Sequence, residues 1–107
     1  MKFRDTDKIQ FLKIKNGLMK IFNNHKPSYI DYHLTCITFK FHLHECFPEQ
    51  IKYTHKLSQI TINELYYNTI KFLGDLDLLD CKVTKSVHLY YVDNIAIRVP
   101  NKYFKGE

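Results

Sequence analysis

The chain has 107 residues and a formal net charge of +5. This length suits one folded domain, residues 1–107, because a second unit would leave too little surface to bury in either half. Hydrophobic residues make up 45% of the chain and it has only three Gly and three Pro, which excludes a disordered or low-complexity protein. No apolar run approaches the roughly 18 residues of a membrane span, so we expect no membrane partner.

The positive charge is almost entirely lysine, since Arg4 and Arg98 are the only arginines. Lysine is a compact, hydrated point charge that suits phosphate backbones better than base edges. The composition therefore points to a polyanionic partner, with a basic protein that has no such partner as an equal alternative. The three cysteines are an odd number and no signal-peptide pattern precedes them, which predicts reduced thiols in a cytoplasm.

The first predicted element is an amphipathic helix over residues 5–24. Apolar residues recur there at spacings of three and four, with caps available at the start and a stop at the end. The apolar stripe is Phe11, Ile14, Leu18, Ile21 and Phe22; the caps are Asp5, Thr6 or Asp7; the stop is Asn23, Asn24 and Pro27. On a 3.6-residue wheel, Lys13, Asn16 and Lys20 lie opposite that stripe. Lys8 and Lys15 lie on its border, so the exposed face is basic.

Two strands are predicted after this helix. Residues 32–44 alternate between apolar and polar side chains, with a change of parity that predicts a bulge or break near Cys36. Residues 51–57 alternate again and predict a strand that returns against the first.

The second predicted helix begins at the capping box of residues 61–64 and ends at Gly74, a suitable left-handed residue. Strands follow at residues 81–84, 87–92 and 95–99, with Asp93 and Asn94 as a hairpin turn. A short basic tail begins at about residue 101. The sequence thus predicts a small α+β domain with two main helices on antiparallel sheet, in the order αββαβββ.

One group of residues suggests metal chemistry. His42, His44 and Cys46 occupy alternate positions, and on a strand all three project to one side, where they suit zinc. His55, Cys81 or His88 are available as a fourth ligand, but no established zinc spacing accompanies them. No nucleophile elbow or glycine-rich phosphate loop occurs either. We therefore expect no metal, no cofactor and no enzyme activity.

A binding surface draws on more of the chain. Lys13 and Lys20 project from the first helix, and aromatic residues near lysines offer stacking planes for bases. These aromatic residues are Tyr90, Tyr103 and Phe104. Parity in the last hairpin predicts that Tyr90 faces outward and Tyr91 inward. Cations and rings together favour single-stranded nucleic acid.

Laid out in order, the chain resembles the RegA-type translational repressors of T4-type phages. The resemblance rests on short segments at both helices and at the C-terminus, none diagnostic alone. They are residues 11–15 with Leu18, Asn23, Asn24 and Lys26, then Tyr32 and Cys36, residues 69–73 with Asp75, Leu78 and Leu79, and finally Val99, Pro100, Lys102, Tyr103 and Gly106.

The resemblance implies a phage protein that binds the initiation regions of early messenger RNAs and competes with the ribosome. The family's RNA-contacting helix face carries over onto Lys13 and Lys20, and its strand aromatic residue onto Tyr90. Two features depart from the family. Gly17 stands where the family has a polar contact residue, and the segment from residue 81 to 87 is shorter.

The expected function is therefore an RNA-binding translational repressor in the host cytoplasm, acting as a monomer or weak homodimer. Its expected RNA contacts are Lys13, Lys15, Asn16, Lys20 and Tyr90. One alternative is a phage-encoded inhibitor that binds a host protein. Another is a small zinc-dependent hydrolase built on His42, His44 and Cys46.

Overall fold

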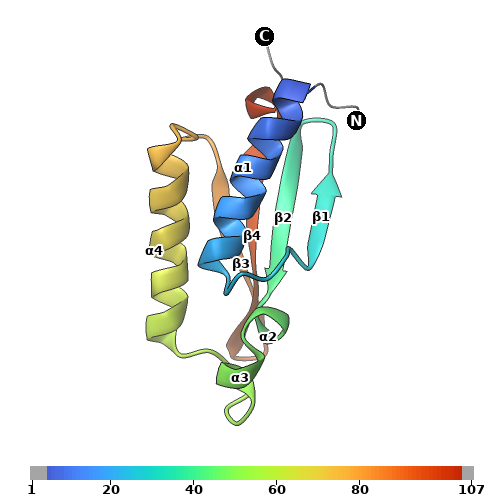
Figure 1. Cartoon of the computed structure of the whole chain (residues 1–107). Coiled ribbons are helices and arrows are strands. Elements are labelled where there is room, and N and C mark those ends of the chain that lie inside the picture. Colours follow the sequence, from blue (N-terminus) through green and yellow to red (C-terminus); the bar gives the residue numbers. More distant parts are fainter. Residues whose placement is uncertain (1–4, 105–107) are drawn as a thin grey trace.

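The computed structural model of the chain describes residues 5–104, with side chains from residue 8 onward. Two long helices and a four-stranded sheet dominate the described part (Figure 1). The elements in chain order are α1 Asp5–Ile21, β1 Tyr29–Tyr32, β2 Cys36–His42, α2 Leu43–Cys46, α3 Pro48–Ile51, α4 Gln59–Asp75, β3 Lys82–His88, β4 Tyr91–Pro100 and the short 3-10 helix η1 Asn101–Tyr103. The predicted α+β class is confirmed, and the order is roughly the predicted one.

The sheet is antiparallel throughout, with strand order β1-β2-β4-β3. β2 and β4 occupy its centre and pair from Cys36 opposite Pro100 to His42 opposite Asn94. β1 and β3 form the two edges. The C-terminal strand therefore lies between β2 and β3, which precede it in the chain.

Only one face of the sheet carries the hydrophobic core. α1 lies across that face, and α4 runs beside α1 along β3 (Figure 1). The inward-facing residues of the central strands are all fully buried: Ile37, Phe39, Phe41, Ile95, Ile97 and Val99. Ile14, Leu18, Leu65 and Leu73 from the two long helices join them, as does Phe22 directly after α1. No helix in the described part of the chain is long and apolar enough to cross a membrane.

The helix ends follow local chemistry, with two corrections. The N-cap of α4 is Ser58, three residues before the start of the predicted box, and its side chain accepts a hydrogen bond from the Thr61 N–H. At its other end Gly74 is helical, and the left-handed residue is Asp77 at φ 59°. α1 ends as predicted, since Asn23 and Asn24 both adopt positive φ. The predicted caps of α1 fall on side chains outside the described residues.

Gly17 has a packing role that accounts for its place in α1. A Cβ atom at this position would lie 2.1 Å from the Cζ atom of Phe72 on α4. Only glycine leaves room for that ring, so Gly17 sets how closely the two long helices approach. It therefore faces α4, which explains why it is not a polar surface residue.

The segment after His42 differs from the prediction. β1 and β2 are separate strands, joined through residues 33–35, so the expected break near Cys36 is real. Residues 43–57 form two single-turn helices and a turn, and the predicted strand at residues 51–57 is wrong. Leu43, Cys46 and Leu57 are buried, because this segment closes the lower end of the core. From the sequence, a short apolar run in a segment of this kind looks the same as a run in a strand.

The C-terminal hairpin is also shifted. Its turn lies at Leu89 and Tyr90, with Leu89 at φ 58°, instead of at Asp93 and Asn94. Asp93 and Asn94 belong to β4, at a register shift opposite residues 86 and 87. Two long strands therefore replace the three predicted short ones. The bulge interrupts the alternation of apolar and polar residues within β4. In the sequence, such an interruption looks like a turn between two strands.

The predicted C-terminal tail is wrong as far as Phe104. The Phe104 ring is 1% exposed and packs beside Phe11, with ring centroids 6.0 Å apart. Asn101 is buried, and its side-chain amide donates hydrogen bonds to the carbonyl oxygens of His33 and Leu34 at 3.1 and 2.6 Å. The residues after β4 thus lock the β1-β2 connection to the core, and Phe104 is no stacking platform.

Candidate nucleic-acid interface

The outer surface of α1 is basic. From Lys8 to Ile21 the helix contains four lysines and no acidic residue. Lys8, Lys13 and Lys20 are exposed, and none of the three forms an ion pair with another described residue. Four positive charges along about three helical turns, with no counter-ion among the side chains that the structure describes, give this surface a positive potential.

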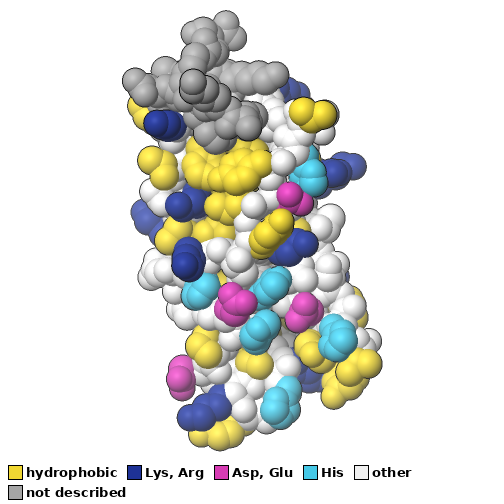
Figure 2. Space-filling view, turned by 90° about the vertical axis from the view of Figure 1, so that its right-hand side faces the viewer, with side chains coloured by type: hydrophobic (Ala, Val, Ile, Leu, Met, Phe, Trp, Pro, Cys, Tyr) yellow, Lys and Arg dark blue, Asp and Glu magenta, His cyan; other side chains and the backbone are white. Residues whose placement is uncertain are grey.

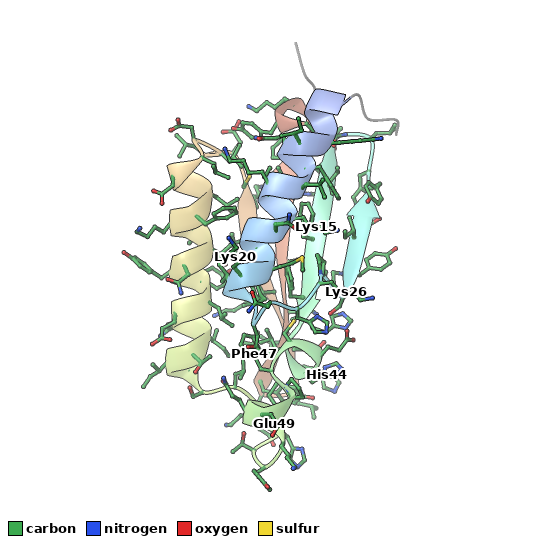
Figure 3. The ribbon with its side chains drawn as sticks, viewed as in Figure 1. Lys15, Lys20, Lys26, His44, Phe47 and Glu49 are labelled. Carbon is green, nitrogen blue, oxygen red and sulfur yellow. The ribbon has the colours of Figure 1, made fainter. Side chains whose placement is uncertain are left out.

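The other two predicted α1 residues lie where the helical wheel placed them. Asn16 is exposed between Lys13 and Lys20, and Lys15 is half-buried on the border of the apolar stripe. Figure 3 shows Lys15 and Lys20 on α1, and Lys26 in the segment that leads from α1 to β1. The basic surface therefore continues past the end of the helix.

A shallow groove of about 370 Å³ runs between α1 and α4 beside Lys20. The Gly17 backbone and the Phe72 ring line it, together with Lys71 and Asp75 from α4. Lys71 and Asp75 are a loose, exposed pair at 3.8 Å, which neutralises little of the surface. Lys20 is the free cation of this groove among the described residues.

Tyr90 is exposed as predicted, with 79% of its surface accessible, whereas Tyr91 is half-buried. Tyr90 lies in the β3-β4 turn. The Lys56 ammonium lies 5.5 Å from the centre of its ring, a cation–π contact. The two side chains line a groove of about 420 Å³, which Ser58 and Lys85 also border. Lysine, hydroxyl and ring in one groove suit a nucleotide.

The structure does not bring Tyr90 to the α1 lysines. The β3-β4 turn lies at the lower end of the molecule beside α3, whereas α1 crosses the upper part of the sheet (Figure 1). The residues around Tyr90 come from the approach to α4 and from β3. Sequence reasoning missed Lys56 and Lys85 as its neighbours, because they are close to Tyr90 only through the fold.

The predicted metal candidates do not form one site. Leu43–Cys46 is helical, so His42, His44 and Cys46 no longer alternate along a strand. The His42 and His44 rings stack at 5.9 Å, while Cys46 is turned into the core at 1% exposure. In the part of the chain that the structure describes, no three His, Cys, Asp or Glu side chains gather to hold a metal ion.

Several of the histidines nevertheless share one region. Figure 2 shows histidine side chains on the lower half of the molecule, with acidic side chains among them. His42 Nδ1 lies 3.4 Å from Glu45 Oε2, and a hydrogen bond from Ser28 lowers the pKa of Glu45, helped by His42. His44, His55 and His88 line a groove of about 460 Å³. Each predicted fourth ligand except Cys81 thus lies near His44, but without metal geometry.

The cysteines have the properties of buried apolar residues. Cys36, Cys46 and Cys81 are all free thiols. Burial raises the pKa of Cys46 to about 12 and that of Cys81 to about 11, with the neighbouring Glu45 and Asp80 adding to the effect. Neutral thiols are poor nucleophiles, so neither residue is activated for catalysis.

A comparison with protein-family models finds none that matches this chain, and comparisons with curated proteins and with solved structures find no match either. The resemblance to RegA-type repressors therefore remains a hypothesis drawn from the sequence.

Proposed function

We propose that this protein binds single-stranded messenger RNA through the outer surface of α1 and represses translation by covering the initiation region. The observation that carries the proposal is the set of exposed lysines on α1, Lys8, Lys13 and Lys20, none of which forms an ion pair with another residue that the structure describes. Release of counter-ions from RNA phosphates drives such binding without reading base sequence. The initiation region as target rests on the sequence resemblance alone.

Tyr90 forms a second contact in this proposal. Its exposed ring stacks on a base while Lys56 and Lys85 meet the adjoining phosphates. A strand that uses both contacts runs down the helix side of the molecule, from α1 past the start of α4 to the β3-β4 turn (Figure 1). Contacts at both ends of the molecule suit a repressor, because they cover a longer stretch of the messenger RNA than one contact does.

The α1 contact is tested with Lys13→Ala, Lys20→Ala and the double variant. The probe is a short labelled RNA with a purine-rich ribosome-binding sequence and a start codon, followed by fluorescence anisotropy at several salt concentrations. Each substitution should weaken binding and lower the salt slope by about one unit, since one phosphate contact is lost. Lys52→Ala, which removes one charge at the end of α3, is the matched control and should change both far less.

Binding that is independent of salt, or full affinity of the double variant, contradicts the proposal. Repression is measured separately, by adding the protein to an in vitro translation reaction. The wild type should inhibit the message that it binds, and the double variant should not. Tyr90→Ala should cost about 1–3 kcal/mol of binding free energy, whereas Tyr90→Phe keeps the stacking plane and should cost little.

Inhibition of a host protein is the second candidate function, and exposed apolar residues on α4 support it. Tyr67 and Ile70 are 66% and 54% exposed on α4. Ile70 also borders an apolar groove of about 300 Å³ that Leu78 and Leu79 line. Exposed aromatic and aliphatic side chains of this kind suit protein contacts. Pull-down from host lysate with and without ribonuclease separates the two functions, because a partner that survives the nuclease favours the inhibitor.

A further inference from the structure

The face of the sheet opposite the helices is open among the described residues. Its outward side chains are ordered by the strand register into rows across the four strands. One row is Lys82, Arg98, Thr38 and Asp31, and the next is Thr84, Ala96, Lys40 and Tyr29. We call these eight residues the open face. Lys82, Thr84 and Arg98 are exposed, while Thr38, Lys40 and Ala96 are half-buried by their neighbours.

Lys82 and Arg98 are direct cross-strand partners on this face. Two like charges directly opposite each other in a sheet repel, whereas opposite charges attract. Neither side chain forms an ion pair with a described residue. They line a hollow of about 250 Å³ beside Thr35 and Pro100. An anion in that hollow would relieve the repulsion and gain two charge-assisted hydrogen bonds.

The nearby carboxylates are already engaged. Asp80 borders the same hollow, but its carboxylate is held by the Lys102 ammonium. Asp31, in the row of Arg98, lies 2.8 Å from His33 Nε2. The cations of the open face therefore keep their charge available for an external partner.

The remainder of the face suits a flat ligand. Tyr29 on the edge strand is 55% exposed and is the cross-strand partner of Lys40. Beyond Lys40 in this row lie Ala96 on β4 and Thr84 on the edge strand β3, and both side chains are short. Neighbouring strands are about 4.8 Å apart, so a ring at one edge and a cation pair near the other span the width of a nucleotide or two. A ring for a base and cations for phosphates characterise sheets that bind single strands.

We propose that the open face is a second binding surface for single-stranded RNA, in which Lys82 and Arg98 hold a phosphate and Tyr29 stacks on a base beside Lys40. The inference rests on the proposed function for the identity of the polymer. It adds a surface on the other side of the sheet from α1. Sheet and helix then contact either one strand that wraps the β1 edge or two separate strands.

The test uses the whole chain and a labelled single-stranded RNA, with Lys82→Thr/Arg98→Thr and Tyr29→Ala as variants. Threonine is a good strand residue, so the sheet should remain intact. The double variant should weaken binding about 10- to 100-fold, the loss expected for hydrogen bonds to a charged group. Its salt slope should fall by up to about two units. Tyr29→Ala should weaken binding, whereas Tyr29→Phe, which keeps the ring, should retain it.

Lys13→Ala/Lys20→Ala, measured in parallel, separates this inference from the proposed function. Full affinity of the Lys82→Thr/Arg98→Thr variant with weak binding of the α1 variant overturns the open face and leaves α1 standing. The reverse pattern supports the open face and removes α1. No binding by the wild type removes both.

Backbone amide shifts on RNA titration give a second readout. Shifts at Thr38, Thr84 and Ala96 support the inference, and shifts confined to α1 overturn it. A complex with an acidic protein that survives ribonuclease and depends on Lys82 and Arg98 overturns the assignment to RNA.

Discussion

The two faces of the sheet are built from the same strands, yet they differ in burial and in charge. Phe39 and Phe41 point into the core and are fully buried, while Thr38 and Lys40, one residue away, point to the open side. On the helix-covered face, the buried residues of the central strands, Ile37, Phe39, Phe41, Ile95, Ile97 and Val99, are all apolar. The open face has three cations with no counter-ion among the described residues. The buried face therefore stabilises the fold, whereas the cations of the open face are available to a partner.

A second lesson concerns where charge is tolerated. A domain that needed only stability would pair Lys82 and Arg98 with acidic residues, as the Lys102–Asp80 pair does beside them. Departures from the rules of local stability, such as two like charges facing each other, are expected at functional sites. The buried face therefore predicts large losses of stability on substitution, and the open face predicts small ones with large losses of binding.

The largest expected effect is on the buried face. The Phe41 ring stacks on Phe22, the first residue after α1, with centroids 4.1 Å apart. Phe41→Ala should lower the free energy of unfolding by about 3–5 kcal/mol, because it removes a buried ring and leaves a cavity. Lys40→Thr, at the adjacent residue, is the control and should change it by about 0.5 kcal/mol. Chemical denaturation measures both, and similar losses for the two would mean that the open side is also covered.

Asn101 is expected to come next. Asn101→Ala removes the two hydrogen bonds to the carbonyl oxygens of His33 and Leu34, and should cost about 1–3 kcal/mol. Asn101→Asp keeps the shape but replaces the donor by a carboxylate that repels both oxygens, so its loss should be larger. An Asp variant as stable as the wild type would show that this amide does not fasten the β1-β2 connection.

Much of this architecture was predictable because its causes are local. The spacing of Ile14, Leu18 and Phe22 gave α1 its buried side, and the alternation around Phe39 and Phe41 gave β2 its faces. The end of α1 was also predictable from Asn23 and Asn24. These residues show the period or the turn chemistry that a sequence displays directly.

The errors arose where tertiary contacts decide. Phe104 lies beyond Pro100, where the last strand ends, in a segment rich in polar residues, so nothing local indicates that it enters the core beside Phe11. The candidate site divides in the same way. The exposure of Lys13 and Lys20 followed from a wheel, but the cross-strand pairing of Lys82 with Arg98 depends on a register that a bulge shifts. Tyr29 and Lys40 meet only because β1 is a separate strand.

The contact between the two long helices gives a prediction of intermediate size. Gly17→Ala should favour the helix by up to about 1 kcal/mol, but the new Cβ would overlap the Phe72 ring. Displacing that ring costs about 1–3 kcal/mol, so the net effect should be a loss of stability. Combining Gly17→Ala with Phe72→Leu should recover part of it, as a double-mutant cycle would show. A stabilising Gly17→Ala would mean that the ring moves freely.

The smallest effect is also the sharpest test of the open face. If Lys82 and Arg98 repel each other in the free protein, Lys82→Thr or Arg98→Thr should raise its stability by about 0.2–1 kcal/mol. Salt should reduce that gain, because it screens exposed charges. Thermal unfolding at low and high salt measures both trends, with Thr84→Ser as a neutral control on the same face. Variants that are less stable than the wild type at low salt would mean that the two cations already have an attractive partner within the chain. Stabilisation joined to weaker RNA binding would instead show that the repulsion is retained for a ligand, which no purely structural role of these two residues explains.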